Sequence, residues 1–373
     1  MTPRILIIAG SDSGGGAGIQ ADIKTVTMLG GHAMTAITAI TAQNTLGVQA
    51  VLPVPTEMVL AQIDSCLSDI GVDAVKIGMI GSAETAHAVA DRLEPLDVPI
   101  VFDPVMIATS GATLADPATI AAFARLMRIA TVVTPNTPEL AALGGEAAVL
   151  AHDCHVLAKG GHVDGAEVID RLIGADGEVA RWSGPRIATT SAHGTGCTLA
   201  SGIATLLGQG RALPLAVAVA RDFVRLALCD APRLGQGHGP LGQQAVRLDL
   251  GGDLRFNQVT LGSTDHAASR DFYRALGLRQ IVESADHYAR FETPGGATLS
   301  IERGARPTVF LECDDLAATV ARLEADGMTF DQRPTDQPWL WREARLTDPA
   351  GNTVCLYHAG ENRRFPPWRL PDA

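Results

Sequence analysis

Two glycines and a threonine precede a cysteine in the stretch "HGTGCTLASGIA", where a helical pattern of apolar residues begins. At the start of a helix, free backbone N–H groups and the helix dipole attract a phosphate or a developing oxyanion. The N–H groups in question belong to Gly194, Thr195, Gly196 and Cys197. The same field is expected to lower the pKa of the Cys197 thiol, so that a thiolate accepts a proton from an attacking hydroxyl group. The alternative for a lone cysteine is a small apolar residue in a core.

A second glycine-rich stretch, "GSDSGGGAGIQADIKT", follows the first apolar run of the chain. It lacks the GxxxxGK[ST] pattern of the nucleotide P-loop, and its glycines do not fit the GxGxxG pattern of dinucleotide-binding folds. Glycines have no Cβ, so they allow the backbone to approach a ligand closely. The alternative is a tight turn that binds no ligand.

Lysine is rare in this chain, because only Lys24, Lys76 and Lys159 stand among its 29 basic residues. Lysine offers a compact, rotatable ammonium group, whereas arginine offers a planar fork. A lysine kept in such a chain indicates a position that needs the compact group, with chance as the alternative. For Lys76, an ion pair with a neighbouring carboxylate is a further alternative.

The elements that must position these residues alternate along the first 230 residues. Short apolar runs predict strands at 4–10, 33–44, 73–79, 98–105, 130–136 and 154–161. Apolar residues at three-to-four spacing predict helices at 57–70, 83–93 and 117–128. This alternation predicts an α/β fold, with a mostly parallel sheet and helices on both faces.

Ligands of such sheets bind beyond the carboxyl ends of the strands. The residues that follow those ends are Gly10, Gln43, Asn44, Met79, Asp103, Pro104, Asn136, Lys159, Gly160 and Gly161. A row of polar residues and glycines at one edge of a sheet is what an active site requires. The alternatives are a core role for Met79 and for Val105, and a strand-end or turn cap for Gln43.

A domain boundary is expected between Arg233 and Asp253, where glycine becomes dense and the alternation stops. Beyond it, the twenty residues from Val259 align without a gap with those from Val309. Each copy predicts a strand, an acidic turn, a helix and a glycine stop, followed by further strands. The second domain is therefore expected to be α+β, with paired βαβββ units. The predicted divisions are a first domain at 1–241, a glycine-rich linker at 242–254, a second domain at 255–358 and a C-terminal tail at 359–373.

Composition narrows the class of partner. The chain has 373 residues, a hydrophobic fraction of 46% and a net charge of −12. This charge does not attract nucleic acid or an anionic membrane surface, so a small-molecule partner is predicted. The first apolar run is too short for a signal peptide and no other run reaches membrane-spanning length, so we expect a cytoplasmic protein. The six cysteines are scattered without a CxxC pair, which favours neither disulfides nor a zinc site.

Eight stretches of the first domain, in order, resemble the hydroxymethylpyrimidine/phosphomethylpyrimidine kinase family, which has the ribokinase-like fold. They are "AGSDSGGGAGIQADIKT", "AQNTLGVQ", "VKIGMIG", "FDPVM", "TPNTPE", "KGGH", "HGTGCTLASGIA" and "GHGP". The resemblance covers about residues 4–241. It implies a homodimeric enzyme of thiamine biosynthesis that uses ATP and Mg²⁺. Its substrates would be 4-amino-5-hydroxymethyl-2-methylpyrimidine and then the monophosphate of that alcohol.

The resemblance also implies roles for individual residues. Gln43 would hydrogen-bond the pyrimidine, and the pocket around the ring would be lined by Asp22, Ala17, Met79 and Val105. Cys197 would take the catalytic-base position, where most ribokinase-like kinases have aspartate. The anion hole would consist of Gly194, Thr195 and Gly196. The phosphates would be contacted by Lys159, Asn136 and Thr195, and the magnesium–phosphate array would be held by Glu139 with help from Asp103.

Phosphoryl transfer is compatible with this set of residues. Its loose transition state needs cations, an anion hole and an in-line acceptor more than it needs a strong base. The second transfer uses a phosphate oxygen that is already ionised near neutral pH. We therefore expect the Cys197→Ser substitution to impair the first transfer more than the second.

The second domain resembles the glyoxalase/bleomycin-resistance (vicinal oxygen chelate) superfamily through "ASRDFYRALGL", the repeat and "LTDPAGNTVCLY". Metal-dependent members carry His and Glu ligands on equivalent strands of the two repeats. The residues at those places here are Gln258, Ser300, Thr308 and Cys355. Because these side chains make a poor divalent site, the resemblance implies a metal-free module that binds a small ligand or mediates assembly.

Two alternatives for the second domain remain open at this point. An off-register metal site would use His266, His287, Glu302 and His358. A flat ligand ring would stack on aromatic side chains, which otherwise belong to a core or an interface. The candidates for stacking are Trp339, Trp341, Tyr288 and Phe291.

Two rival functions remain for the first domain. A pyridoxal (vitamin B6) kinase is one, because that ring also carries a hydroxymethyl group on the same fold. The stretch "AQNTLGVQ" and the cysteine of "HGTGC" favour the pyrimidine. A non-catalytic small-ligand-binding protein is the other rival, and the intact "KGGH" and "HGTGC" stretches speak against it.

Overall fold

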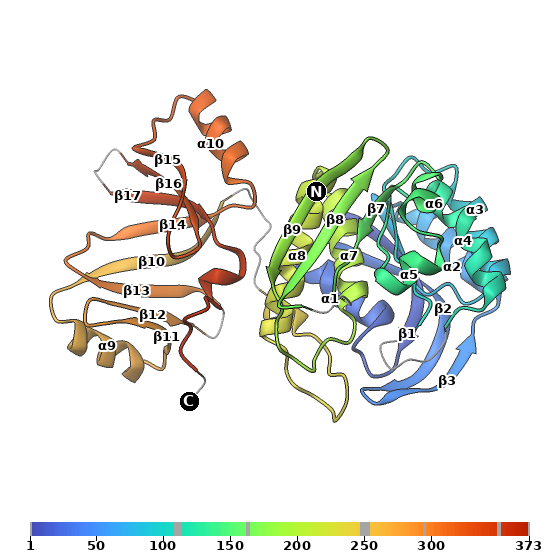
Figure 1. Cartoon of the computed structure of the whole chain (residues 1–373), viewed down its shortest axis with the longest axis horizontal. Helices are drawn as coiled ribbons and strands as arrows, with labels where there is room; N and C mark the ends of the chain where they lie inside the picture. The colour runs from blue at the N-terminus through green and yellow to red at the C-terminus, as the bar shows by residue number, and fades with distance from the viewer. Residues whose placement is uncertain are drawn as a thin grey trace. The chain divides into compact units, whose positions relative to one another are not determined.

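The computed structural model describes residues 2–107, 114–161, 165–246, 254–293, 296–348 and 352–371. The chain divides into two compact units, Met1–Gln244 and Ala245–Ala373. Each unit is described by itself (Figure 1). Within these ranges, every helix is too short or too polar to cross a lipid bilayer.

The described part of the first unit contains a nine-stranded sheet in the order β3-β2-β1-β4-β5-β6-β7-β8-β9. Its strands are β1 (Arg4–Asp12), β2 (His32–Asn44), β3 (Gly47–Pro53), β4 (Ala74–Ile77), β5 (Ile100–Phe102), β6 (Val132–Val133), β7 (His155–Ala158), β8 (Glu167–Gly174) and β9 (Gly177–Pro185). From β2 to β7 in this order, each strand is parallel to the next. Antiparallel hairpin strands extend both edges. The predicted mostly parallel sheet is confirmed.

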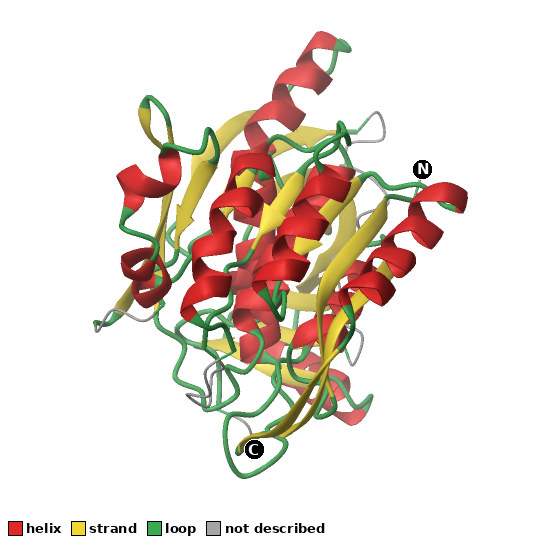
Figure 2. Ribbon diagram, turned by 90° about the vertical axis from the view of Figure 1, so that its right-hand side faces the viewer, coloured by secondary structure: helices red, strands yellow, loops and turns green. Residues whose placement is uncertain are grey.

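Helices cover both faces of this sheet (Figures 1 and 2). They are α1 (Gly18–Met28), α2 (Thr56–Asp69), α3 (Ala83–Leu93), α4 (Pro117–Ile129), α5 (Thr137–Ala142), α6 (Glu146–Leu150), α7 (Thr195–Gly208) and α8 (Leu213–Cys229), followed by the 3₁₀ turn η1 (Gln243–Ala245). α1 and α7 pack together against β1 and β4, and α8 packs on α7. α2, α3 and α4 form a second contacting group on β2 and β5. The layers are those expected from alternating strands and helices.

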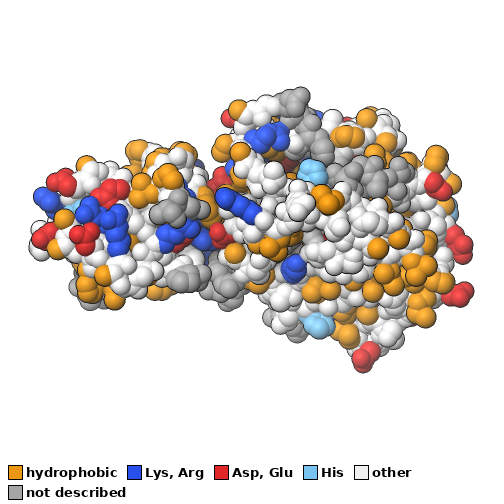
Figure 3. Space-filling model, turned by 90° about the horizontal axis from the view of Figure 1, so that it is seen from below, with side chains coloured by type: hydrophobic (Ala, Val, Ile, Leu, Met, Phe, Trp, Pro, Cys, Tyr) orange, Lys and Arg blue, Asp and Glu red, His pale blue; other side chains and the backbone are white. Residues whose placement is uncertain are grey.

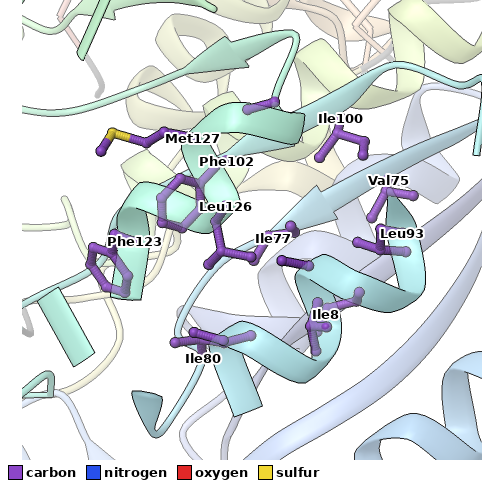
Figure 4. Close-up of a cluster of buried hydrophobic side chains, with 14 of the residues drawn as sticks. Ile8, Val75, Ile77, Ile80, Leu93, Ile100, Phe102, Phe123, Leu126 and Met127 are labelled. Carbon is purple, nitrogen blue, oxygen red and sulfur yellow. The ribbon is translucent and has the colours of Figure 1, made fainter. Parts of the chain in front are cut away.

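The central strands are buried because helices cover them on both sides. Figure 4 shows one such core, in which Ile8, Ile77 and Phe102 meet Phe123 and Leu126 of α4. The rings of Phe102 and Phe123 are 5.1 Å apart at an interplanar angle of 83°. Burial of each such side chain stabilises the fold by about 1.5–3 kcal/mol. This core fixes the strand ends from which the loops of the site emerge.

Strands β3, β8 and β9 were not predicted from the sequence. β3 and β9 are the outermost strands, and most of their residues are exposed or only half-buried. An exposed edge strand has no consistent buried face, so its hydrophobic pattern is weak. β8 lies inside the sheet, between β7 and β9, and was missed although half of its residues are buried. The other six interior strands coincide with the predicted runs.

The described part of the second unit contains an eight-stranded sheet in the order β11-β12-β13-β10-β14-β17-β16-β15. Its first half consists of β10 (Arg255–Ser263), α9 (His266–Ala275), β11 (Arg279–Ser284), β12 (Tyr288–Glu292) and β13 (Thr298–Arg303). Its second half consists of β14 (Thr308–Glu312), α10 (Leu316–Ala325), β15 (Gln332–Asp336), β16 (Arg342–Thr347) and β17 (Thr353–His358). The predicted pair of βαβββ units is confirmed.

The two halves use the same residues to start and stop their helices. Asp265 accepts a hydrogen bond from the N–H of Ala268, and Asp315 accepts one from the N–H of Ala318. The glycine after each helix has positive φ, 86° at Gly277 and 90° at Gly327. Both features are ordinary helix signals, and their recurrence at an offset of fifty residues explains the repeat in the sequence.

The C-terminal segment after β17 packs on the first half of this sheet. It begins with the 3₁₀ turn η2 (Gly360–Arg363). Arg363 Nη1 donates to the backbone oxygen of Gly296, at 2.7 Å, and the N–H of Leu370 donates to Ile281. Arg364 and Arg369 both pair with Glu292, at 3.1 Å and 2.7 Å. The tail is therefore an integral part of the second unit.

Candidate active site

A cavity of about 1000 Å³ lies in the first unit, beyond the carboxyl ends of its parallel strands. The loops after β1, β2, β4, β5, β6 and β7 contribute to its walls, together with the start of α7. The predicted site residues that line it are Ala17, Gln43, Met79, Asp103, Val105, Asn136, Glu139, Lys159, Gly194, Thr195, Gly196 and Cys197. Residues distant in the sequence thus share one cavity.

The predicted anion hole lies where α7 begins. Gly194 is the N-cap residue of this helix and has a φ of 92°, in the left-handed region that favours glycine. A Cβ at Gly194 would overlap the backbone oxygen of Gly16. The two glycine-rich loops therefore touch, and only glycine fits at the contact. Gly194 leaves the N–H groups of the first turn of α7 beside the cavity.

Lys159 follows β7 and is close to the same helix start. Its Nζ is 2.8 Å from Asp103 Oδ1, which also accepts a hydrogen bond from Thr134. A Cβ at Gly196 would lie 3.4 Å from Lys159 Nζ. Burial opposes the charged form of Asp103, but Lys159 and Lys76 hold the pKa of this carboxyl below its usual range. The arrangement places a cation directly beside the anion hole.

Asn136 and Glu139 form a capping box at the start of α5. The Asn136 side chain accepts a hydrogen bond from the N–H of Glu139, and the Glu139 carboxylate accepts one from the N–H of Asn136. Glu139 Oε2 is 4.0 Å from Lys159 Nζ. Burial raises the pKa of Glu139 to about 7; Lys159 opposes the shift and Asp103 adds to it. This carboxyl group therefore changes its charge near neutral pH.

The predicted low pKa of Cys197 is wrong. Burial raises the pKa of the Cys197 thiol to about 11, and the carboxylates of Asp22 and Asp103 add to this shift. Lys76 and the N–H of Gly18 act in the opposite direction without cancelling it. The field of a helix start favours thiolate, but here burial and two anions outweigh that field. At neutral pH Cys197 is a thiol.

Asp22 does not line the cavity, contrary to the role that the resemblance implies. Its side chain is fully buried on α1 and pairs with Lys76 of β4 at 2.8 Å. Ser201 of α7 donates to its other oxygen at 2.6 Å. Burial opposes the charge of Lys76, but the Asp22 carboxylate raises the pKa of this ammonium group above its usual value. Lys76 lines the cavity and carries a permanent positive charge there.

The third lysine, Lys24, does not line the cavity. Lys24 Nζ donates to the backbone oxygen of Gly15 at 2.8 Å, which ties α1 to the loop before it. Of the three lysines of the chain, Lys76 and Lys159 line the cavity, whereas Lys24 makes a structural contact beside it.

His193 is the histidine of the "HGTGC" stretch and lies in the wall of the cavity. It is buried, and its Nε2 is 3.0 Å from Asp12 Oδ2 and 3.0 Å from Gln43 Nε2. Thr41 Oγ1 lies 3.2 Å from Gln43 Oε1. Asp12, Thr41, Gln43 and His193 all line the cavity. His162, of the "KGGH" stretch, lies outside the described residues.

The remaining residues predicted to contact the substrate, Met79 and Val105, follow β4 and β5. A Cβ at Gly10 would be 3.0 Å from the Met79 sulfur, so a larger residue at position 10 would displace Met79. Thr38 donates to the backbone oxygen of Met79 at 2.6 Å. The N–H of Val105 donates to the backbone oxygen of Asp103 at 2.8 Å, in the loop after β5. Met79 and Val105 both face the cavity.

In the second unit, the four residues at the superfamily's ligand positions make other contacts. Gln258 accepts a hydrogen bond from Thr298 at 2.7 Å, and Ser300 shares one of 2.9 Å with Tyr288. Thr308 donates to the backbone oxygen of Arg306. Cys355 is fully buried. The described residues contain no group of three or more His, Cys, Asp or Glu side chains placed to hold a metal ion.

The aromatic candidates of the second unit are divided between different surroundings. Phe291 is fully buried in the core beside α9. Trp341 stacks on Tyr357 at 4.7 Å, with the Arg290 guanidinium 4.6 Å from its ring centroid. Trp339 is 38% exposed and donates to Glu343. A single stacking site built from all four predicted aromatics is not formed.

Comparison with known proteins agrees with this geometry. The family described as phosphomethylpyrimidine kinase matches residues 12–242, and the glyoxalase/bleomycin resistance protein/dioxygenase superfamily matches residues 255–356. Hydroxymethylpyrimidine/phosphomethylpyrimidine kinases from Streptomyces coelicolor and Rhizobium meliloti are each 46% identical to this chain. The match to the Streptomyces protein covers 64% of this chain and 93% of that protein. The match to the Rhizobium protein covers 65% of this chain and 97% of that protein.

Solved structures of kinases are also similar to this chain. An ADP complex of Bacillus subtilis pyridoxal kinase is 30% identical, with a TM-score of 0.62, and covers 67% of this chain and 100% of its own. A phosphomethylpyrimidine kinase from Clostridium difficile is 35% identical, with a TM-score of 0.52, and covers 60% of this chain and 98% of its own.

Proposed function

The chain belongs to the phosphomethylpyrimidine kinase family, and from this we infer that it phosphorylates 4-amino-5-hydroxymethyl-2-methylpyrimidine and then its monophosphate, with ATP as the phosphate donor. The products belong to thiamine biosynthesis. The observation that carries the proposal is the convergence of the "KGGH" lysine, the "HGTGC" turn and Gln43 on one cavity. Gln43 is more than a hundred residues from the other two stretches in the sequence, yet all three line the same cavity.

The anion hole and Lys159 would stabilise the transferred phosphoryl group. Backbone N–H groups at the start of α7 are fixed in direction, and Lys159 Nζ lies beside Gly196. Preorganised donors of this kind contribute about 2.7–4 kcal/mol each to transition-state stabilisation. Asn136 and Thr195 complete the phosphate-binding wall.

Mg²⁺ fits the carboxylates of this cavity. Asp103 and Glu139 both line it, and carboxylate oxygens are the ligands that Mg²⁺ prefers. Bound with ATP, the ion would neutralise charge on the phosphates. Asp103 would keep its charge through its pair with Lys159, while Glu139 would gain full charge only above about pH 7.

Cys197 would act as the base from its small thiolate fraction. With a pKa of about 11, about one thiol in ten thousand is ionised at pH 7. In the first transfer, the hydroxyl oxygen bonds to the γ-phosphorus, the bond to ADP breaks and the hydroxyl proton passes to the sulfur. In the second transfer, the attacking phosphate oxygen carries no proton, so no base is needed.

Incubation of the protein with magnesium, ATP and the hydroxymethylpyrimidine tests the proposal, with pyridoxal in a parallel reaction. Successive appearance of the monophosphate and the diphosphate in the mass spectrum is the expected result. Phosphorylation of pyridoxal alone would assign the chain to the vitamin B6 kinases, a second candidate supported by the 30% identical Bacillus subtilis structure. Absence of both products would favour a non-catalytic binding protein.

We also propose that the first unit pairs with a second copy through the β2–β3 hairpin. Exposed apolar side chains gather on and beside this sheet edge: Ile40, Leu46, Val51, Leu52 and Met58. Figure 3 shows hydrophobic side chains gathered on the face from which this hairpin projects. A second copy would cover them, so sedimentation should give a dimer that Leu52→Asp dissociates. We place the enzyme in the cytoplasm, where ATP is available.

For the second unit, we propose a metal-free role in small-ligand binding or assembly. The tail already fills part of the first half of its sheet, through buried Arg363 and Arg364. A ligand would therefore bind away from the tail, on the second half of the sheet. Metal analysis of the purified protein tests this proposal, because a stoichiometric bound ion would contradict it.

A further inference from the structure

The carboxylate of Asp12 determines where His193 carries a proton. Asp12 is 3% exposed, and it accepts hydrogen bonds from the backbone N–H groups of Gly14, Gly16 and Ala17. Burial opposes its charge, but His193 and these N–H groups lower its pKa below the usual value. A carboxylate oxygen 3.0 Å from His193 Nε2 is stable only when that nitrogen carries a proton.

A protonated Nε2 in turn determines how the Gln43 amide must face. The Nε2–H group of His193 only donates, so the Gln43 atom 3.0 Å from it must be an acceptor, the carbonyl oxygen. Turning the amide over exchanges its oxygen and nitrogen. The nitrogen then donates to Thr41 Oγ1, which itself donates to the backbone oxygen of Ser11 at 3.0 Å. In this orientation the single Nε2–H proton faces two acceptors, Asp12 and Gln43, whereas the reverse orientation sets two donors against each other.

His193 has little freedom to leave this position. Its backbone N–H donates to Gly239 at 3.1 Å, and Gly194 follows it directly at the start of α7. Its ring lies against Gly16, where a Cβ would overlap the ring carbon Cδ2. The imidazole is thus held by two glycine-rich loops, and the Gln43 side chain, on β2, rests against it.

We propose that His193 is a positioning residue that locks the Gln43 amide in one orientation and so makes the pocket specific for an amino-substituted ring edge. The inference rests on the proposed function, in which Gln43 contacts the pyrimidine. An aminopyrimidine edge offers a donor, the amino group, beside an acceptor, the ring nitrogen. A locked amide offers its acceptor and donor in a fixed order that matches this edge. The 4-oxo analogue offers the reverse order, which only a freely turning amide accommodates.

The test is the ratio of kcat/KM for the 4-amino substrate to that for 4-oxo-5-hydroxymethyl-2-methylpyrimidine. A site built to hydrogen-bond its substrate discriminates strongly against a mismatched analogue, so His193→Leu should reduce this ratio by about tenfold or more. The KM for ATP should not change. His193→Gln keeps an N–H group at a similar reach and should retain most of the ratio. The control is His87→Gln, an exposed position on α3.

An unchanged ratio in His193→Leu would overturn the proposal, because a purely structural role lowers activity on both substrates alike. Asp12→Asn provides a second variant, which should also lower the ratio because it removes the carboxylate that holds the His193 proton. Calorimetric binding of the two alcohols without ATP gives the same ratio independently of turnover. A wild-type protein that binds the amino compound without phosphorylating it would contradict the proposed function, while the binding ratio would still decide the role of His193.

Discussion

Cys197 interacts electrostatically with two buried ion pairs, Lys76 with Asp22 and Lys159 with Asp103. The sum of their charges is close to zero, so burial dominates and the thiol remains protonated. A cysteine in these surroundings is a weak base and a weak nucleophile at neutral pH. Such a group suits an enzyme that phosphorylates both an alcohol and a phosphate, because it does not add a further negative charge to the carboxylates of the cavity.

The pH dependence of the two transfers should therefore differ. Below a pKa of about 11, each rise of one pH unit increases the Cys197 thiolate tenfold. Above about pH 8, Glu139 is ionised, and so is the phosphate that accepts the second phosphoryl group, whose second pKa is about 6. In this range only the thiolate fraction still changes, so the rate of the first transfer should rise with pH. The rate of the second transfer should stay level. Rapid-quench measurement of each transfer separately gives both profiles.

Cys197→Ser should slow the first transfer by about 10²-fold, in the range of general-base contributions, and the second far less. Cys66→Ser, on α2 and away from the cavity, is the control. Equal losses in both transfers would show that the sulfur contributes binding or shape rather than proton transfer.

At the scale of elements, one buried ion pair connects a strand and two helices, β4, α1 and α7. Lys76 of β4 and Asp22 of α1 are both fully inaccessible, and Ser201 of α7 donates to Asp22. Removing one partner leaves a buried charge uncompensated, which costs about 3–5 kcal/mol. The same pair carries the positive charge that faces Cys197, so it couples the stability of the fold to the electrostatics of the site.

Lys76→Met should therefore lower the free energy of unfolding of the first unit by about 3–5 kcal/mol, measured in urea. Replacing Asp22 by Asn in the same chain should restore part of the loss, because no buried charge remains. The comparison is Arg92→Met, which breaks the exposed pair with Asp64 and should cost about 0–1 kcal/mol. Similar losses for the buried and exposed pairs would contradict this account.

The contact between the two glycine-rich loops gives a second prediction at this scale. Gly194→Ala requires a left-handed alanine, at about 1–2 kcal/mol, and also forces its Cβ into the Gly16 carbonyl. Gly210→Ala is a matched control, because its φ is 80° and no atom lies within 4 Å of its Cβ position. Thermal unfolding should show a larger loss for Gly194→Ala, and kinase activity should be lost only there. Equal losses would mean that the loops separate easily.

Six interior strands of the first sheet were predictable because their apolar runs are clear, whereas the edge strands β3 and β9 and the interior strand β8 were not. The convergence of Gln43 and Lys159 followed from the rule that parallel strands end at one edge. Cys197 lies in the first turn of a helix, and its place in the site was implied by the family resemblance. The pKa of Cys197 was predicted with the wrong sign, because it depends on Asp22 and Asp103, whose proximity is a tertiary fact. His193 lacked a role for the same reason, since its partner Asp12 is 181 residues away.

At the scale of the whole molecule, the tail makes the second unit depend on the last part of the chain. Burial opposes the charge of Glu292, and Arg369 and Arg364 hold its pKa below the usual value. The Phe365 ring lies within 5.0 Å of both guanidinium groups. Residues that follow the last strand thus supply the cations for a carboxylate buried on β12.

The double substitution Arg364→Ala and Arg369→Ala should lower the stability of the second unit by about 3–5 kcal/mol. Kinase activity should be unchanged, since both residues lie outside the first unit. The exposed pairs of Arg322 and Arg333 provide the matched control, Arg322→Ala with Arg333→Ala. Hydrogen exchange resolves the two units, and unaltered protection of β12 would contradict the prediction.

The place of this tail also sets an order of events during synthesis. The first unit ends at Gln244, so it can leave the ribosome and fold while the second is still being made. The second unit cannot complete the surroundings of Glu292 until residue 370 has cleared the exit tunnel. The second unit is therefore completed later than the first, whose kinase site can already be assembled by then.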